Sequence, residues 1–359
     1  MPTFTAEQLR TIGVNLFEAV GVPKRESEIV CQHLVEASLA GVDSHGVIRI
    51  PQYVEAIQTG RISPGAKYDV VQETPSSALI NGNRGFGQVI AQQAISVAIQ
   101  KARNSAISAV SVHNCGHLGW LAGYTMMAAD EELIGMMMVN AGGGGQTVAP
   151  FGGTARRLAT NPISIAVPSP RGGRERVGTG KANPIVLDIA TSVAPEGKIR
   201  AIRNRGEQVP EGWIVDHKGR STTNPDDFYG PPPGALLPLG GAAGHKGFGL
   251  GFIIDILAGG LSGAGCSRAD TPQEPSSDGA LVVVIDIQKF TPLDDFYSRV
   301  AQLVAHVKSS PTAPGFDEIV VPGEPESRER EKRLRTGIFV DETVWRQIRG
   351  IMEERGISR

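Results

Sequence analysis

Residues 88–112 read QVIAQQAISVAIQKARNSAISAVSV, and the spacing of apolar residues changes within this stretch. From Gln88 to Arg103 the apolar residues recur at helical spacing, which predicts an amphipathic helix. The run from Ile107 to Val112 is rich in β-branched residues and is typical of a strand. A helix that leads directly into a strand is the unit from which layered α/β folds are built.

The same alternation extends to both sides of this stretch. Strands are predicted before it, at Tyr68–Gln72 and Ala78–Asn81, and a helix is predicted after it, near Leu118–Ala129. Further strands and one more long helix are then expected at Leu133–Asn140, Ile163–Val167, Ile185–Ile189, Leu281–Ile287 and Leu293–Lys308. The pattern favours an α/β fold.

The N-terminal 60 residues have a different, purely helical pattern. A capping box between Thr5 and Gln8 opens the first of three predicted helices. Each helix is expected to stop at a glycine, namely Gly21, Gly41 and Gly60. We therefore expect a small helical unit before the first strand.

Three segments in the C-terminal half carry further predictions. The longest apolar stretch, Phe248–Ala264, contains Asp255 and several glycines and is shorter than the ~20 apolar residues of a membrane span, so we interpret it as a buried helix. The mixed-charge run Glu326–Arg335 follows a Pro/Gly turn and is interpreted as a solvated helix face. A closing helix is predicted from Asp341.

Composition narrows the class of protein. The chain has 359 residues, 40% hydrophobic and 20% charged, with a net charge of −2, as expected of a globular protein. Neither a nucleic-acid partner nor a membrane is expected, because the chain has no basic stripe and no long apolar span. Three widely separated cysteines, Cys31, Cys115 and Cys266, and an N-terminus without a signal-peptide core favour the cytoplasm.

The segment Asp43–Tyr53, with the sequence DSHGVIRIPQY, combines an acid/base candidate with an anion-binding candidate. Asp43 or Ser44 could cap a helix, which would place His45 and Arg49 on one face, four residues apart. An imidazole can move a proton near neutral pH, and a guanidinium can bind a carboxylate bidentately. The alternative is a simple cap followed by a solvated face.

A nucleotide site of the usual kind is not indicated. No predicted strand is followed by Gly-x-Gly-x-x-Gly, and the Walker pattern is absent. The segment Gly244–Gly251 instead precedes an apolar helix, so its free N–H groups, with His245 and Lys246 beside them, could bind an anion. A tight turn before a close-packed helix explains the same glycines.

Two other segments place titratable side chains at predicted strand ends. His117 follows the strand that begins at Ile107 and is a second acid/base candidate, or an ordinary loop histidine. His113 and His117 could suggest metal ligands, but the sequence offers no further ligand cluster, so no metal is expected. Asp188 ends another apolar strand and could orient a histidine, accept hydrogen bonds from a cofactor, or cap the helix that follows, together with Thr191 and Ser192.

The chain as a whole resembles the malate/L-lactate dehydrogenase family of NAD(P)-dependent oxidoreductases, which is unrelated to the Rossmann-fold lactate and malate dehydrogenases. The resemblance is carried by Asp43–Gly46 with Arg49 and Tyr53, Gly116–Gly119, Val148–Gly153, Thr160–Pro162, Leu187–Ser192, Pro210–Trp213, Gly244–Gly249 and Val321–Glu324.

This resemblance implies a central mixed-sheet α/β domain with a non-Rossmann cofactor site, and a helical domain built from both chain ends. It implies domain ranges of 1–70, 71–310 and 311–359, the last returning to the helical domain, and a homodimer with the site near the subunit interface. Catalytic roles are implied for Ser44, His45, Arg49, His117 and Asp188. Contacts to NAD or NADP are implied for His45, Gly119, Trp120, Leu121, Leu187, Asp188, Ile189, Ala190, Thr191, His245, Lys246, Pro322, Gly323 and Glu324.

The resulting expectation is hydride transfer between NAD(P) and a small 2-hydroxy or 2-oxo carboxylic acid. His45 or His117 would carry the proton, and Arg49 would hold the carboxylate. Three alternatives stay open: reduction of a cyclic imino acid, a nucleotide-binding protein without turnover, and a metal-dependent hydrolase that uses His113 and His117.

Overall fold

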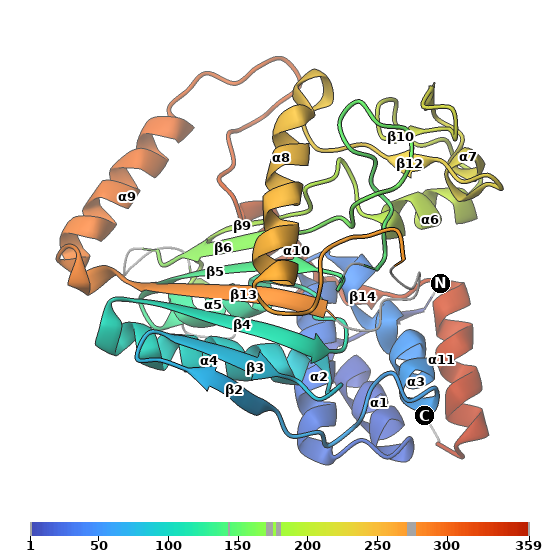
Figure 1. The fold of residues 1–359 in the computed structure, drawn as a ribbon, viewed down its shortest axis with the longest axis horizontal. Helices are drawn as coiled ribbons and strands as arrows, with labels where there is room; N and C mark the ends of the chain where they lie inside the picture. The colour runs from blue at the N-terminus through green and yellow to red at the C-terminus, as the bar shows by residue number, and fades with distance from the viewer. Residues whose placement is uncertain (1, 143, 170–174, 177–180, 271–277, 358–359) are drawn as a thin grey trace.

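The computed structural model describes residues 2–142, 144–169, 175–176, 181–270 and 278–357 (Figure 1). Its centre is a seven-stranded mixed sheet with the strand order β2-β3-β4-β13-β5-β6-β9. The strands are β2 (Asp69–Glu73), β3 (Ser77–Asn81), β4 (Ile107–Cys115), β13 (Asp278–Asp286), β5 (Leu133–Asn140), β6 (Ile163–Val167) and β9 (Ile185–Ile189). All seven predicted strands are present, and the α/β fold with a central mixed sheet is confirmed.

Helix α4 (Gly87–Ser105) connects β3 to β4, the parallel pair of this sheet, and the other neighbouring strands pair antiparallel. Helices α4 and α5 (Ala122–Asp130) pack on one face of the sheet, and α8 (His245–Ile254) with the π-helical turn η4 (Asp255–Gly260) packs on the other. Successive strand residues serve opposite faces, so Met137 belongs to the first core and Met138 to the second.

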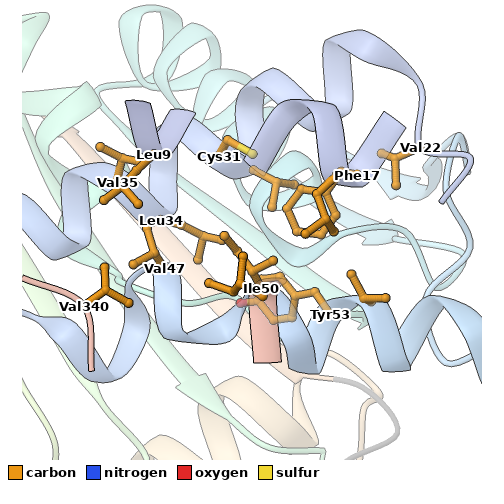
Figure 2. Packing of buried hydrophobic residues seen from close by; sticks show 14 of the residues in the cluster. Leu9, Phe17, Val22, Cys31, Leu34, Val35, Val47, Ile50, Tyr53 and Val340 are labelled. Atoms are coloured by element: carbon orange, nitrogen blue, oxygen red, sulfur yellow. The ribbon is translucent and has the colours of Figure 1, made fainter. Parts of the chain in front are cut away.

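The helical unit at the N-terminus has its own core, which includes residues from the C-terminal end of the chain. Helices α1 (Ala6–Ala19), α2 (Lys24–Leu39) and α3 (Ile50–Gln58) end before Gly21, Gly41 and Gly60, as predicted, and the capping box of Thr5 is present. Leu9, Phe17 and Leu34 of α1 and α2 pack in one cluster with Val340, which precedes the closing helix α11 (Glu342–Glu354) (Figure 2). The short strands β1 (Thr3–Phe4) and β14 (Ile338–Phe339) pair the two chain ends. The domain boundaries near residues 70 and 310 stay a prediction.

A smaller unit lies beyond the β9 edge of the sheet. It contains α6 (Glu196–Asn204), α7 (Pro225–Tyr229) and a three-stranded sheet of β11 (Ser221–Thr222), β10 (Ile214–Val215) and β12 (Ala235–Leu236). A two-residue pair, β7 (Glu175–Arg176) and β8 (Lys181–Ala182), precedes β9. No helix in the part of the chain that the structure describes has the length and apolar character needed to cross a bilayer.

The interpretation of Phe248–Ala264 as a buried helix is wrong in one respect. The stretch is helical, as α8 and η4, but Phe252, Ile253 and Leu261 are 50%, 51% and 61% exposed. Only one side of the helix, including Ile254, meets the sheet. A sequence that is apolar on all sides predicts burial without saying whether the same chain supplies the covering surface.

Two further helices lie in the C-terminal third. Helix α9 (Leu293–Lys308) has the predicted bounds but extends away from the sheet, and within α9, all of which the structure describes, only Tyr297 is buried (Figure 1). Helix α10 (Glu324–Thr336) contains the mixed-charge run, and Gly323, the residue before it, lies directly beside strand β9.

Candidate active site

The segment that carries Ser44 and His45 is not the continuous helix that the sequence suggested. It forms two 3₁₀ turns, η1 (Asp43–His45) and η2 (Val47–Arg49), separated by Gly46 with φ −90° and ψ −152°. The reason is the close approach of α2, because a Cβ on Gly46 would lie 2.0 Å from Ser38 Oγ. That hydroxyl accepts a hydrogen bond from the Val47 N–H at 3.0 Å. His45 and Arg49 therefore do not stack at helical spacing.

Arg49 instead folds back on the turn that precedes it. Its Nε donates to the Ser44 carbonyl oxygen at 2.6 Å, and its Nη1 donates to Gln52 Oε1 at 2.5 Å. Within the described residues this leaves Nη2 without a hydrogen-bond partner. Burial lowers the pKa of the Arg49 guanidinium, which nevertheless stays charged at any physiological pH. A half-buried cation with an unused donor is a natural partner for a carboxylate.

His117 follows β4 and is held by two buried polar side chains. The hydroxyl of Tyr53 lies 2.9 Å from His117 Nδ1. Gln88 Nε2 donates both to that hydroxyl, at 2.8 Å, and to the His117 carbonyl oxygen, at 3.1 Å. Because the Tyr53 oxygen accepts from Gln88, its own proton is directed at Nδ1. Neutral His117 is therefore held as the tautomer that carries its proton on Nε2.

Three histidines lie close together beside Arg49. The rings of His45 and His117 stack with centroids 5.5 Å apart and planes inclined by 19°. His33, from α2, stacks on Tyr124 at 4.8 Å and accepts a hydrogen bond from the Trp120 N–H at 3.0 Å. His33 thus contacts the loop between β4 and α5, the same loop that carries His117.

Burial is the main cause of the low pKa values of these histidines. Burial, and then the Arg49 guanidinium, lower the pKa of His45 to about 4. Burial and then His45 lower the pKa of His33 to about 3. The pKa of His117 is also lowered well below its usual value by burial, then by Arg49 and the other two imidazoles. Burial therefore favours the neutral form of all three rings, and a bound anion would favour the protonated form.

Two carboxylates fix the ends of the loop that carries His117. Asp278, at the start of β13, accepts a hydrogen bond from the Leu118 N–H at 2.9 Å. Asp188, at the end of β9, accepts one from the Ala122 N–H at 3.0 Å. Burial raises the pKa of each carboxyl to about 7. Asp188 thus caps a helix, but the helix is α5 and not α6, the one that follows it in sequence.

Residues Thr191 and Ser192 do not cap α6 either. The Thr191 hydroxyl donates to the Thr160 carbonyl oxygen at 2.9 Å, and the Ser192 hydroxyl donates to the Ala194 carbonyl oxygen at 2.8 Å. Helix α6 begins at Glu196, after Pro195. The first bond joins the segment after β9 to Thr160, and the second lies within that segment. Neither hydroxyl reaches α6, because β9 ends several residues before α6 starts.

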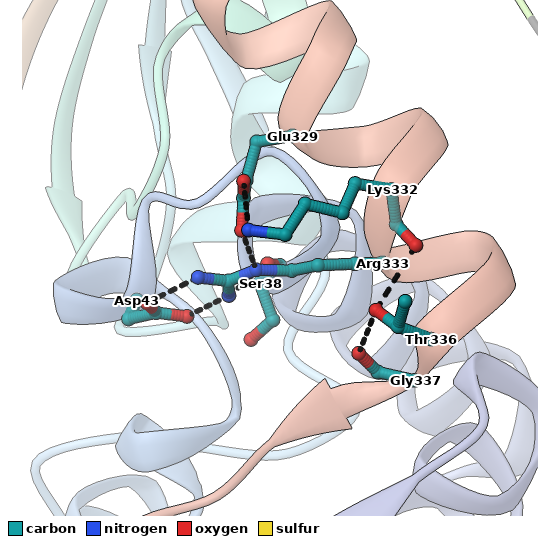
Figure 3. A network of polar contacts seen from close by, with 7 residues as sticks. All are labelled: Ser38, Asp43, Glu329, Lys332, Arg333, Thr336 and Gly337. Atoms are coloured by element: carbon teal, nitrogen blue, oxygen red, sulfur yellow. Dashed lines mark hydrogen bonds and ion pairs between the residues drawn. The ribbon is translucent and has the colours of Figure 1, made fainter.

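Helix α10 contacts the other side of η1 (Asp43–His45), which we call the histidine turn (Figure 3). Arg333 donates from Nη1 and Nη2 to the two carboxylate oxygens of Asp43, at 2.5 and 3.0 Å. Its Nη1 also donates to the Ser38 carbonyl oxygen at 2.6 Å, and its Nε to Glu329 at 2.7 Å. The charged run is therefore only partly a solvated face, because this cation ties α10 to the residue before Ser44.

The histidine turn lines a cavity of about 1780 Å³. Nine of the residues implied by the resemblance line it, namely Ser44, His45, Gly119, Trp120, Leu121, Asp188, Ile189, Ala190 and Gly323. Eight others lie outside the lining: Arg49, His117, Leu187, Thr191, His245, Lys246, Pro322 and Glu324. Arg49 and His117 are both close to His45, which does line the cavity. His245 and Lys246 are exposed at the start of α8, where His245 meets Phe151 edge to face at 5.6 Å.

Comparison with known proteins identifies the family. The sequence model of the malate/L-lactate dehydrogenase family matches residues 4–349. The chain belongs to this family. It is 37% identical to a malate dehydrogenase of Pyrococcus abyssi, over 98% of this chain and 94% of that one.

Solved structures of the same fold agree. A putative malate/lactate dehydrogenase from E. coli superposes with a TM-score of 0.90 at 30% identity, over 100% of this chain and 97% of that chain. A Δ1-piperideine-2-carboxylate reductase from Pseudomonas syringae superposes with a TM-score of 0.80 at 25% identity, over 98% of this chain and 100% of that chain. This member of the malate/L-lactate dehydrogenase family is thus an enzyme, a hydroxyacid dehydrogenase.

Several side chains that shape the site were not singled out from the sequence. They are His33, Gln88, Asp278 and Arg333. Gln88 and His33 lie within amphipathic helices, where a polar residue is normally taken to face solvent. Among the described residues no group of three or more His, Cys, Asp or Glu side chains is placed to hold a metal ion.

Proposed function

We propose that this enzyme transfers a hydride between NAD or NADP and C2 of a small 2-oxo or 2-hydroxy carboxylic acid of the malate and lactate type. One observation carries the proposal: Arg49 lies close to the stacked imidazoles of His45 and His117, and His45 lines a cavity of about 1780 Å³. A carboxylate binder and a proton carrier are the two groups that reduction of a 2-oxo acid requires.

The cavity and its lining fit a dinucleotide. Its volume of about 1780 Å³ exceeds the roughly 300–1,000 Å³ of an ordinary small-ligand pocket, so a dinucleotide and a small acid can share it. The Gly119–Leu121 segment, Asp188 and Gly323 would hold the cofactor, because all of them line the cavity. A bound nicotinamide supplies the hydride.

Arg49, His45 and His117 would each have a separate function toward the substrate. Arg49 holds the substrate carboxylate and so fixes which face of the carbonyl is presented. His45 moves the proton, because its Nδ1 lies 2.9 Å from the Ser44 hydroxyl, a group that can donate or accept. His117, held by Tyr53 as the Nε2–H tautomer, donates a hydrogen bond to the reacting oxygen. The negative charge of the bound acid offsets the low pKa that burial gives His45.

The test is absorbance of the reduced nicotinamide while purified enzyme meets a panel of 2-oxo acids with NADH and with NADPH. We expect turnover with at least one acid and one cofactor. The variant His45→Gln should lose turnover by roughly 10²- to 10⁴-fold, while its cofactor affinity, followed by fluorescence of the bound dinucleotide, stays within a few-fold. Dinucleotide binding without turnover by the wild type would overturn the proposal in favour of a binding protein.

A second candidate is reduction of a cyclic imino acid, which the likeness to the Pseudomonas syringae reductase favours. Arg49 would keep its role, and less proton transfer would be needed because the imine nitrogen is already basic. A cyclic imino acid in the same panel separates the two candidates. The His45 variant should retain far more activity with the imine than with an oxo acid.

We also propose that the enzyme is a cytoplasmic homodimer. The support is a face of α8, η4 and the residue that follows η4, on which the large apolar side chains of Leu250, Phe252, Ile253, Ile256 and Leu261 are more than one third exposed. Leu303 and Val307 of α9 are exposed as well. Light scattering should give twice the chain mass, and Ile253→Asp should shift it to a single chain. A wild-type monomer would contradict the proposal.

A further inference from the structure

The first turn of α6 forms part of the cavity wall next to the histidine turn. A Cβ on Gly197 would lie 3.3 Å from Ser44 Cβ, so α6 packs against η1 at this point. Lys198, the next residue, is exposed and lines the same cavity as Ser44 and His45. Lys198 is therefore a cation of the cavity wall close in sequence to the residue that packs on Ser44.

The other cations that line this cavity are neutralised within the chain. Each Arg forms an ion pair with a carboxylate of the protein: Arg25 with Glu28, Arg176 with Asp130, Arg200 with Glu196, Arg205 with Glu207 and Arg330 with Glu36. Among the described residues Lys198 has neither an ion pair nor a side-chain hydrogen bond. It is thus the cation of this wall that remains available to a ligand.

The surroundings of Lys198 do not offset its charge. Glu196, two residues earlier on the same helix, is held by Arg200 at 2.8 Å and accepts a hydrogen bond from the Tyr229 hydroxyl at 2.7 Å. The carboxylate nearest in sequence is therefore already shared by two donors. A flexible ammonium on a four-carbon stem can follow an anion over the width of a small substrate.

We propose that Lys198 determines specificity by binding a second anionic group of the substrate, which makes a dianionic 2-oxo acid the preferred class. Arg49 holds the carboxylate next to the reacting carbonyl, and Lys198 holds the anion at the other end. The inference rests on the proposed function and adds to it the charge of the substrate and the residue that reads it.

The experiment compares two acids with the same four-carbon chain, oxaloacetate and 2-oxobutanoate, which differ in the second carboxylate. In Lys198→Met we expect kcat/KM for oxaloacetate to fall roughly fivefold, the upper end for one ion pair at an exposed site. We expect kcat/KM for 2-oxobutanoate and the KM for the dinucleotide to stay within twofold. Lys198→Arg should restore most of the loss, because it restores the charge.

Two controls make the result specific. Lys218→Met removes an exposed lysine that lies outside the cavity lining and should change neither acid. Raising the ionic strength should lower kcat/KM for oxaloacetate more in the wild type than in Lys198→Met, because screening acts on the charge that the variant lacks.

The outcomes that oppose the inference are distinct. An equal loss with both acids, or a rise confined to the KM for the dinucleotide, would show that Lys198 serves the fold or the cofactor. An unchanged ratio between the two acids would overturn the specificity role while leaving the proposed function intact. Absence of turnover with both acids and with the rest of the panel in the wild type would overturn the proposed function, and this inference with it.

Discussion

Replacing Tyr53 by Phe removes one oxygen atom from the centre of the site. Tyr53 is 1% exposed and Gln88 is 1% exposed, so solvent cannot replace the lost hydroxyl. The Gln88 amide and His117 Nδ1 each lose a partner at 2.8 and 2.9 Å. A buried polar group without a partner costs about 1–3 kcal/mol, so we expect the free energy of unfolding to fall by about 2–4 kcal/mol.

The same variant should affect turnover for a separate reason. Without the phenol, His117 is free to exchange its tautomers and to rotate, and the Nε2–H donor is no longer held toward the reacting oxygen. We expect kcat with a 2-oxo acid to fall roughly 10- to 100-fold, a loss of about 1.4–2.7 kcal/mol in transition-state binding. Urea unfolding and initial-rate measurements on the same preparation report the two effects.

Two further variants separate stability from catalysis. Tyr53→Phe combined with Gln88→Leu removes both polar partners, so part of the lost stability should return while kcat stays low. Tyr68→Phe changes a half-buried tyrosine whose hydroxyl has no hydrogen bond among the described residues, and it should change stability by less than about 0.5 kcal/mol. If Tyr53→Phe unfolds and turns over like Tyr68→Phe, the tautomer argument is refuted.

Three other changes have expected outcomes. Arg333→Met should lower kcat several-fold with little change in the KM for the acid. The double variant Arg333→Met with Asp43→Asn should have the same kcat as Arg333→Met alone, because each substitution breaks the same ion pair. Additive losses of kcat in the double-mutant cycle would contradict this. Gly46→Ala should destabilise the fold by about 1–3 kcal/mol in urea, because the added methyl meets Ser38 Oγ at 2.0 Å, and an unchanged midpoint would show that α2 yields. Burial raises the pKa of the Asp278 carboxyl from 3.8 to about 7, so the folded state holds a proton that the unfolded state has lost, and this stabilising contribution is lost as the pH rises through 7. The stability of Asp278→Asn relative to the wild type should therefore increase by up to about 4 kcal/mol between pH 4 and pH 8, as measured by urea unfolding. A difference between the two proteins that does not change with pH would contradict this.

The strands could be predicted because their apolar character is recorded in the local sequence. The runs at β5, β6 and β9 are mostly apolar, with Asn140, Ser164 and Asp188 as polar members, and their observed bounds match the predicted ones. The order of the sheet could not be predicted in the same way. Strand β13 inserts between β4 and β5 although more than a hundred residues separate it from either in sequence, and such a pairing is a property of the assembled layers.

At the candidate site, residue type revealed more than spacing did. His45, Arg49 and His117 were identified because few side chains can move protons or bind carboxylates, and the structure brings them together. The helical spacing that suggested a common face was misleading, since Gly46 breaks the turn. Arg333 was assigned to a solvated face because a paired and an unpaired arginine look alike in a run of mixed charge. Its partner, Asp43, lies 290 residues earlier.

The position of α10 explains why the two ends of the chain are needed at one site. Before the helix begins, the Pro322 carbonyl oxygen accepts a hydrogen bond from the Val186 N–H at 3.1 Å, on the strand that ends in Asp188. Two turns into the helix, Arg333 holds the residue before Ser44. One rigid helix thus fixes the distance between the wall that would hold the cofactor and the turn that would hold the acid. Hydride transfer depends on such a distance, because misplacement by about 1 Å can cost 10²-fold in rate. We therefore expect the ion pair between Arg333 and Asp43 to affect catalysis without touching either reactant.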